Sequence, residues 1–191
     1  MDLELSPSHK SPYRQYLIVA LSTAAITLSA FGMYVHEKSS KEWNVKALHA
    51  QIALSQNQLE RTVANNNLTV YWAGPRAGYL YLLNNVAKNR LILSYISATA
   101  NPKNIVANSR VIATYNSAHA FANTVAAAGL IGNTGFRNSD GSVVFYQTNR
   151  KTDVYIGFPH AQSQVEIYDP TIGQALSLAI LQGQISEVGK K

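Results

Sequence analysis

The sequence predicts an α+β fold, in which a mainly antiparallel sheet of about six to seven strands is packed by two helices and preceded by one transmembrane helix and a stalk helix. Three observations lead to this prediction. Residues 15–35 contain no charge. Short runs rich in Val, Ile and Tyr begin at Leu68. Two longer segments, 116–130 and 170–182, change to the period of a helix.

The composition agrees with one or two domains attached to a membrane. Of the 191 residues, 47% are hydrophobic and only 14% are charged, against roughly 25% in typical soluble proteins. The net charge of +6 favours an anionic partner. The cations form no long run, so nucleic acid is not expected as that partner. The chain has no cysteine, which excludes disulfides and thiolate sites.

The uncharged segment 15–35 is long enough to cross a bilayer, since such a helix spans roughly 31 Å. Tyr16 and Tyr34 stand near its ends, as expected of interfacial aromatic residues. We expect residues 1–14 in the cytoplasm and the rest outside, because a long C-terminal domain is translocated largely regardless of its charge. Small residues at four-residue spacing allow a homo-oligomer through this helix.

Two alternatives remain for this segment. The first is a cleaved signal peptide that ends near Gly32, after a small-x-small sequence. The second is a buried helix of a soluble protein. The apolar run continues past the cleavage sequence to Val35, which favours a single-pass signal anchor in the cell membrane.

Residues 36–67 are the expected stalk. Lys41 to Val63 has the pattern of a polar, weakly amphipathic helix, with too few apolar heptad positions for a coiled coil. The asparagines that follow Ala64 are expected to end it, because Asn favours helix ends and turns.

The α+β domain is predicted at residues 68–182. Its expected strands are residues 68–73, 79–83, 90–98, 110–115, 143–147, 153–158 and 164–169. Apolar residues alternate with Tyr, Glu and Gln in the last two strands, so we expect one apolar and one polar sheet face, with both helices on the apolar face.

The connections of this domain follow from turn and capping residues. Residues 132–142 are expected to form a loop, and residues 183–191 a polar tail. Asn116 or Ser117 is expected to cap the first helix. Asp169 followed by Pro170 is expected to begin the second, since Asp accepts bonds from helix N–H groups and Pro lacks the N–H that would stay unpaired.

Five residues are predicted to bind a partner. Tyr155, Glu166 and Tyr168 belong to the polar face of the expected sheet, Arg76 to a Gly-Pro turn and His160 to a loop. Tyr and Arg are enriched at binding surfaces, although Tyr also suits half-buried strands of any function.

No sequence motif for catalysis is present. The chain lacks the GxSxG, HExxH and glycine-rich nucleotide patterns, and the acids of the domain are dispersed. We therefore expect no catalytic residue, no cofactor and no metal site. A membrane-tethered hydrolase that uses His160 or Glu166 is kept as an alternative.

Two segments, Val70–Leu83 and Thr152–Pro170, resemble a family of uncharacterised actinobacterial membrane-anchored proteins. Its domain opens on a Tyr-Trp-x-Gly-Pro block and closes on a Gln-Val-Glu-Val-Tyr-Asp-Pro block, matched here at Tyr71–Pro75 and Gln164–Pro170. The resemblance implies one membrane span before a small α+β domain and assigns no activity to any residue. The chain departs from that pattern at "PHAQ" and "LILSYIS".

These features together predict a membrane-anchored, extracytoplasmic binding or assembly module. Its expected partners are the lipid bilayer and proteins of the cell envelope. A stalk-and-head component of a pilus, secretion or division assembly is the second interpretation, by analogy with that layout alone.

Overall fold

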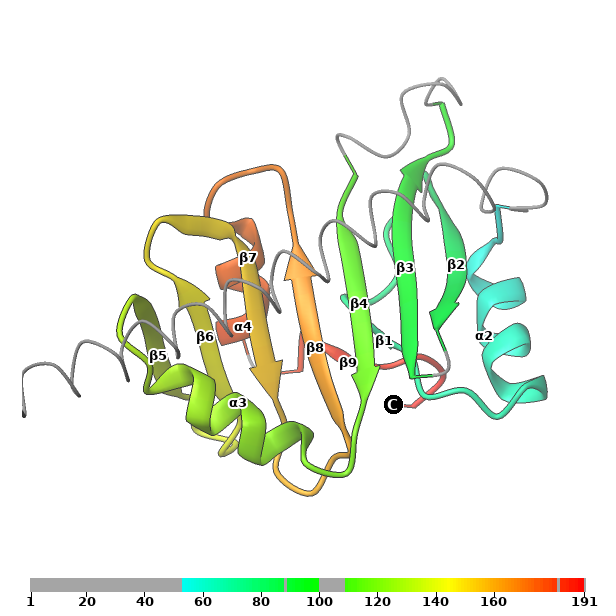
Figure 1. Ribbon diagram of the computed structural model, residues 1–191. Coiled ribbons are helices and arrows are strands. Elements are labelled where there is room, and N and C mark those ends of the chain that lie inside the picture. Colours follow the sequence, from blue (N-terminus) through cyan, green and yellow to red (C-terminus); the bar gives the residue numbers. More distant parts are fainter. Residues whose placement is uncertain (1–52, 88, 100–108, 182, 191) are drawn as a thin grey trace, which may run out of the picture. The chain divides into compact units, whose positions relative to one another are not determined.

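The computed structural model describes residues 53–87, 89–99, 109–181 and 183–190 (Figure 1). The predicted span and the segment before it lie outside this part of the chain, as does most of the predicted stalk. Among the described residues, no helix has the length and apolar character needed to cross a membrane. All of them belong to one compact unit, Gln51–Lys191.

Seven antiparallel strands form the central sheet, in the order β2-β3-β4-β8-β7-β6-β5. They are β2 (Tyr79–Ala87), β3 (Arg90–Ser97), β4 (Val111–Asn116), β5 (Asn133–Arg137), β6 (Val143–Gln147), β7 (Arg150–Gly157) and β8 (Ser163–Tyr168). A small second sheet pairs β1 (Tyr71–Trp72) with β9 (Ser186–Glu187). The described helices are α2 (Gln56–Asn65), α3 (Ala120–Ala128) and α4 (Gln174–Ile180). The predicted α+β class and antiparallel sheet are confirmed.

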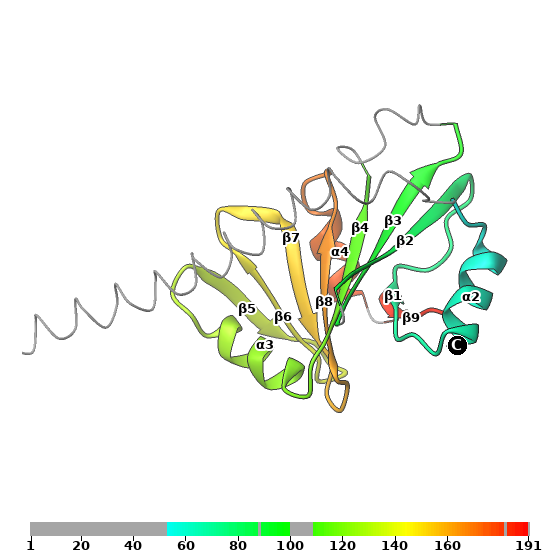
Figure 2. The same ribbon diagram turned by 45° about the vertical axis from the view of Figure 1, so that its right-hand side comes forward.

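The sheet has one apolar face, which carries the core. Cross-strand register places Ile167 between Val154 and Ile112, and all three are buried. Leu59 of α2 and Leu178 of α4 belong to the same core. Figures 1 and 2 show α4, β1 and β9 on the far side of the sheet, where this core lies.

Helix α3 covers the polar face, so the expectation that both helices lie on the apolar face is wrong. Gln164 Nε2 donates to Thr124 Oγ1 of α3 at 2.9 Å. Gln164 pairs in register with Gly157, and a Cβ at Gly157 would come within 2.8 Å of the Thr124 Cβ. The missing side chain lets α3 pack directly on β7, a use of glycine that strand alternation does not reveal.

The segment expected to be a loop contains β5. Residues 133–137 pair with β6 at the edge of the sheet. Gly135 lies under α3, where a Cβ would come within 2.7 Å of the Ala128 Cβ. Asn and Gly are rare in strands, so the propensity pattern missed a strand that packing against α3 and β6 stabilises.

The predicted cap of the first helix is also wrong. Asn116 is the last residue of β4, where its side chain accepts a hydrogen bond from Ser163 Oγ at 2.7 Å. Ser117 Oγ accepts from the His119 N–H at 3.3 Å in the turn that follows. His119 is the N-cap residue of α3, and its side chain makes no capping bond.

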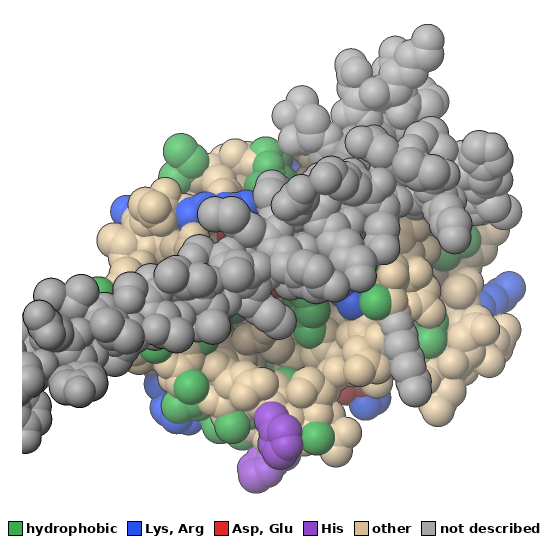
Figure 3. All heavy atoms as spheres, viewed as in Figure 1, with side chains coloured by type: hydrophobic (Ala, Val, Ile, Leu, Met, Phe, Trp, Pro, Cys, Tyr) green, Lys and Arg blue, Asp and Glu red, His purple; other side chains and the backbone are tan. Residues whose placement is uncertain are grey.

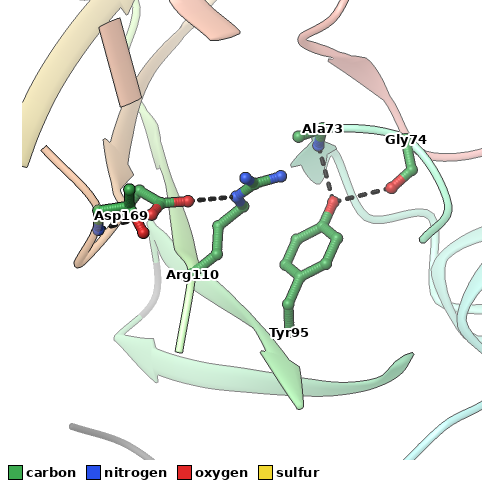
Figure 4. Close-up of polar contacts among 6 residues, drawn as sticks. Ala73, Gly74, Tyr95, Arg110 and Asp169 are labelled. Carbon is green, nitrogen blue, oxygen red and sulfur yellow. Dashed lines mark hydrogen bonds and ion pairs between the residues drawn. The ribbon is translucent and has the colours of Figure 1, made fainter. Parts of the chain in front are cut away.

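Asp169 does not begin the last helix. α4 starts at Gln174, after Gly173. The Asp169 carboxylate instead accepts from Arg110 Nε at 2.8 Å (Figure 4) and from the Thr171 N–H at 2.9 Å. The Arg110 and Asp169 side chains are only 12% and 6% exposed, so loss of either partner would leave a buried charge unpaired.

The C-terminal residues add to the domain instead of forming a polar tail. β9 pairs with β1, and the flanking Ile185 and Val188 are buried in the core. The alternation of apolar residues around β9 is too short to distinguish a strand from a tail in the sequence.

Helix α2 packs into the domain core, and it begins at Gln56 instead of continuing a longer stalk helix. Ser55 is its N-cap and forms a capping box with Gln58. Leu54 pairs with Tyr81 of β2 as an isolated bridge, which excludes a single helix from Lys41 to Val63. The helix ends at the expected asparagines.

We expect Gly157→Ala to destabilise the domain by about 1–3 kcal/mol, because the new methyl group overlaps the Thr124 side chain. Urea unfolding measures this change. Gly129→Ala is the matched control: its Cβ would meet nothing closer than 3.6 Å, so we expect a change within about 0.5 kcal/mol. Equal effects of the two variants would contradict the close contact of α3 with β7.

Candidate functional site

A cavity of about 570 Å³ opens at the end of the sheet where β4 ends and β8 begins. Its lining consists mostly of amides and hydroxyls from separate segments: Thr69, Asn89, Asn116, Ser117, Gln162 and Ser163. Tyr71, His160, Glu187 and Lys190 complete its polar lining. Amides and hydroxyls both donate and accept hydrogen bonds, so the cavity suits a polar ligand.

Backbone hydrogen bonds fix the walls of this cavity. The Asn116 N–H donates to the Asn89 carbonyl at 2.9 Å, and the Ser117 N–H donates to the Gln162 carbonyl at 2.8 Å. The Ser117 and Gln162 side chains remain exposed. The walls are therefore held by the main chain, while these side chains stay accessible to a ligand.

The charges in the described lining are paired with each other. Lys190 Nζ lies 2.6 Å from Glu187 Oε2, and the Tyr71 hydroxyl donates to Glu187 Oε1 at 3.4 Å. Burial and the neighbouring Glu187 charge raise the pKa of Tyr71 to about 12, so this phenol stays a neutral donor at physiological pH. The cavity consequently favours neither anions nor cations strongly.

His160 adopts a left-handed backbone conformation at the rim of the cavity. Its φ is 66°, in a turn closed by a 3.2 Å bond from the Ala161 N–H to the Phe158 carbonyl. Such φ values cost L-residues about 1–2 kcal/mol. A strained residue beside a cavity supports a functional role for its side chain.

The polar sheet face carries a second candidate cluster around Glu166. Its carboxylate accepts hydrogen bonds from the Tyr155 hydroxyl at 3.0 Å and from the Tyr115 hydroxyl. Tyr155 also stacks on Phe145 at 4.8 Å between ring centroids. Glu166 is thus held by two tyrosines of its own domain, which leaves it less available to a partner than the sequence suggested.

Arg90 borders this cluster. Its guanidinium lies 5.4 Å from the centre of the Tyr115 ring, close enough for a cation–π interaction. Among the described residues, its buried Nε finds no hydrogen-bond acceptor. Burial, with the Glu166 charge as the second cause, holds the pKa of Tyr115 and of Tyr155 well above the usual value of a phenol.

The five predicted binding residues occupy three places. Tyr155 and Glu166 are in contact, and Tyr168 lies on the same face of β8, opposite Asp153 in register. His160 lies at the cavity, at the other end of β8. Strand alternation placed Tyr155 and Glu166 on one face without predicting their contact, and it missed Tyr115, whose only signal is its place in a neighbouring strand.

Arg76 lies in the Gly-Pro turn between β1 and β2. The hydroxyl groups of two buried tyrosines form hydrogen bonds with the main chain of this turn. The Tyr95 hydroxyl accepts from the Ala73 N–H at 2.8 Å and donates to the Gly74 carbonyl at 3.0 Å (Figure 4). The Tyr81 hydroxyl accepts from the Arg76 N–H at 2.9 Å. These bonds fix the main chain of the turn, and the Arg76 side chain is exposed.

The described residues do not show the arrangement of a hydrolase. A Ser nucleophile needs a base within hydrogen-bond distance, and neither serine of the cavity lining, Ser117 or Ser163, donates to His160. The described residues also contain no group of three or more His, Asp or Glu that could hold a metal ion.

The chain matches no protein-family model, no curated protein and no solved structure.

We expect His160→Gly to stabilise the domain by up to about 1 kcal/mol, because glycine adopts positive φ without strain and this gain exceeds its entropic cost. His119→Gly is the control, since its φ is −109° and glycine is tolerated at a helix N-cap; it should change stability by only a few tenths of a kcal/mol. Urea unfolding measures both. A loss of stability in His160→Gly would show that its side chain is structural.

We expect Tyr155→Phe to cost about 1 kcal/mol at neutral pH, through loss of the hydrogen bond to Glu166. Tyr168→Phe, whose hydroxyl makes no hydrogen bond within the described chain, is the control and should be neutral. Urea unfolding measures the free energy of unfolding of both variants. Equal losses in the two variants would contradict a stabilising hydrogen bond between Tyr155 and Glu166.

The Tyr155 phenol should also make stability depend on alkaline pH. Its pKa is higher in the folded than in the unfolded chain, so above about pH 10 only the unfolded state releases this proton and stability falls as pH rises. Each retained proton lowers the unfolding free energy by about 1.4 kcal/mol per pH unit. Tyr155→Phe should make the fall shallower; an unchanged slope would contradict the raised pKa.

Proposed function

We propose that the protein is a membrane-anchored binding module whose α+β domain lies outside the cytoplasm and binds a neutral, polar ligand or partner segment. The cavity beside His160 is the observation that supports binding. Its volume of about 570 Å³ lies in the range of roughly 300–1,000 Å³ that is typical of ligand sites. Amide and hydroxyl groups from several segments converge there, as they do where a polar molecule is recognised.

The charges and hydrogen-bonding groups of the lining indicate the chemical class of the ligand. Glu187 and Lys190 compensate each other in the lining, so a strongly charged ligand gains little. A neutral molecule rich in hydroxyl or amide groups, such as a glycan or a peptide main chain, matches the lining best. The Tyr155–Glu166 cluster is a weaker candidate, because its polar groups are bonded to each other and are only half-exposed, whereas the cavity also presents the exposed side chains of Ser117 and Gln162.

The sequence supports the anchor and its orientation. The uncharged segment 15–35 and the long domain after it favour a single-pass chain with its N-terminus in the cytoplasm. Fractionation of cells and protease treatment of intact cells test this part. A soluble, protected domain in the cytosol would contradict it and would leave the cavity proposal intact. No specific contact favours a pilus, secretion or division assembly over simple binding.

Photo-crosslinking from the cavity tests the binding site. We expect a benzophenone amino acid in place of Gln162, which is exposed in the cavity lining, to yield a discrete adduct in membranes. The same substitution at Gln174, exposed at the start of α4, is the matched control and should give none. Mass spectrometry identifies the adduct.

A second substitution shows whether the adduct forms inside the cavity. Ser117→Trp should fill the space next to position 162 and reduce the adduct, with no loss of folding because Ser117 is exposed. Equal adducts from positions 162 and 174, or an adduct insensitive to Ser117→Trp, would contradict binding in the cavity.

A further inference from the structure

Two isoleucines are highly exposed on the described domain. Ile131 is 95% exposed and Ile172 is 78% exposed. Single exposed apolar side chains are common on protein surfaces and need no explanation. These two differ from that background because the segments that carry them both lie beside the β6–β7 hairpin, which contains Arg150 and Lys151.

Both isoleucines lie at the end of the sheet opposite the cavity. The Thr148 N–H donates to the Gly132 carbonyl at 3.0 Å, which places Ile131 beside the turn between β6 and β7. The Asp169 N–H donates to the Thr152 carbonyl at 3.1 Å, so the segment that leads to Ile172 begins beside the start of β7.

Cations are exposed at this end, whereas its described acids are buried. Lys151 is exposed, and the Arg150 side chain is 53% exposed although it pairs with Asp153. Asp153 and Asp169 are only 6% and 4% exposed. Figure 3 shows basic and hydrophobic side chains together at the upper left of the molecule, over the ends of β6 and β7.

The chain enters the domain at the same end of the strands, at the β2 edge of the sheet. Leu54 pairs with Tyr81 through two hydrogen bonds of 2.8 Å, and Tyr81 is the third residue of β2. Fewer than twenty residues separate Leu54 from Val35, where the predicted span ends. A tether of that length keeps the domain within roughly 65 Å of a membrane, so even a weak contact becomes intramolecular and frequent.

We propose that this end of the sheet docks on a membrane surface that contains anionic lipids. Ile131 and Ile172 enter the headgroup region, and Arg150 and Lys151 face the lipid phosphates. Exposed apolar residues flanked by cations are the usual chemistry of such interfacial contacts. The contact orients the domain and turns the cavity, at the other end of the strands, away from the membrane.

The absence of cysteine from the chain allows a direct test with single probes. Full-length Ile172→Cys carries an environment-sensitive fluorophore and is incorporated into vesicles of phosphatidylcholine alone or of equal parts phosphatidylcholine and phosphatidylglycerol. We expect its emission to shift to the blue in the anionic vesicles and to be quenched by lipid-bound quencher. The same fluorophore on Ser117→Cys, a position exposed at the cavity end, should keep the emission of an aqueous environment in both kinds of vesicle.

Charge variants test the electrostatic part. Lys151→Ala should lower the ratio of docked to free domains about fivefold, the contribution of one cation near an anionic surface. Lys190→Ala, at the cavity end, is the control and should leave the ratio unchanged. Raised salt should weaken docking, because it screens these charges.

Several results would overturn the proposal. A probe at position 172 that reports water in anionic vesicles, or a probe at 117 that shifts as much, would exclude docking by this end. A blue shift that appears in detergent without lipid and grows with protein concentration would assign the surface to a second copy of the chain.

The anchor is tested separately by association with phosphatidylcholine vesicles. If the chain fails to associate with them, the proposed anchor is wrong, and the probe's response to added anionic vesicles still decides whether this surface docks.

Discussion

The antiparallel pairing of β8 with β4 and β7 is the constraint on which the rest of the domain depends. It sends Val165 and Ile167 into the core, while Glu166, between them, faces the tyrosines of the neighbouring strands. A slip of one residue would exchange the two faces and bury the carboxylate in the core. The same register brings Asn116 to Ser163 at one end of the sheet, where the cavity opens.

Helix α3 packs on part of the polar face of the sheet, so this face is not simply a solvent-exposed surface. It packs on that face because Gly157 and Gly135 offer no side chains, and Gln164 bonds to it. Near the other end of the face, Glu166 is bonded to Tyr155 and Tyr115. Polar residues that alternate with apolar ones therefore do not imply an open binding surface: here Gln164 contacts a second layer, and Glu166 is bonded to tyrosines of the sheet itself.

Much of the sheet could be predicted from the sequence because its strands alternate clearly, and this alternation placed Tyr155 and Glu166 on one face, although it did not predict the hydrogen bond between them. The failures occurred where distant contacts override local rules. Asp169-Pro170 has the local form of a helix start, yet Arg110, 59 residues away, holds the carboxylate as an ion pair. The cavity joins segments from Thr69 to Lys190, and no periodic pattern connects residues that are so far apart in the chain.

The two ends of the sheet differ in charge because different acids lie at each end and pair with different cations. At the end near Ile172, Asp153 and Asp169 pair with Arg150 and Arg110, while the exposed Lys151 forms no ion pair within the described chain. At the cavity end, Glu187 lies in the lining and compensates Lys190 directly. An anionic surface is therefore attracted to the first end and not to the second, and hydroxyls and amides remain to determine what the cavity accepts. A domain with such ends has a preferred orientation near a charged membrane even before any side chain enters the lipid.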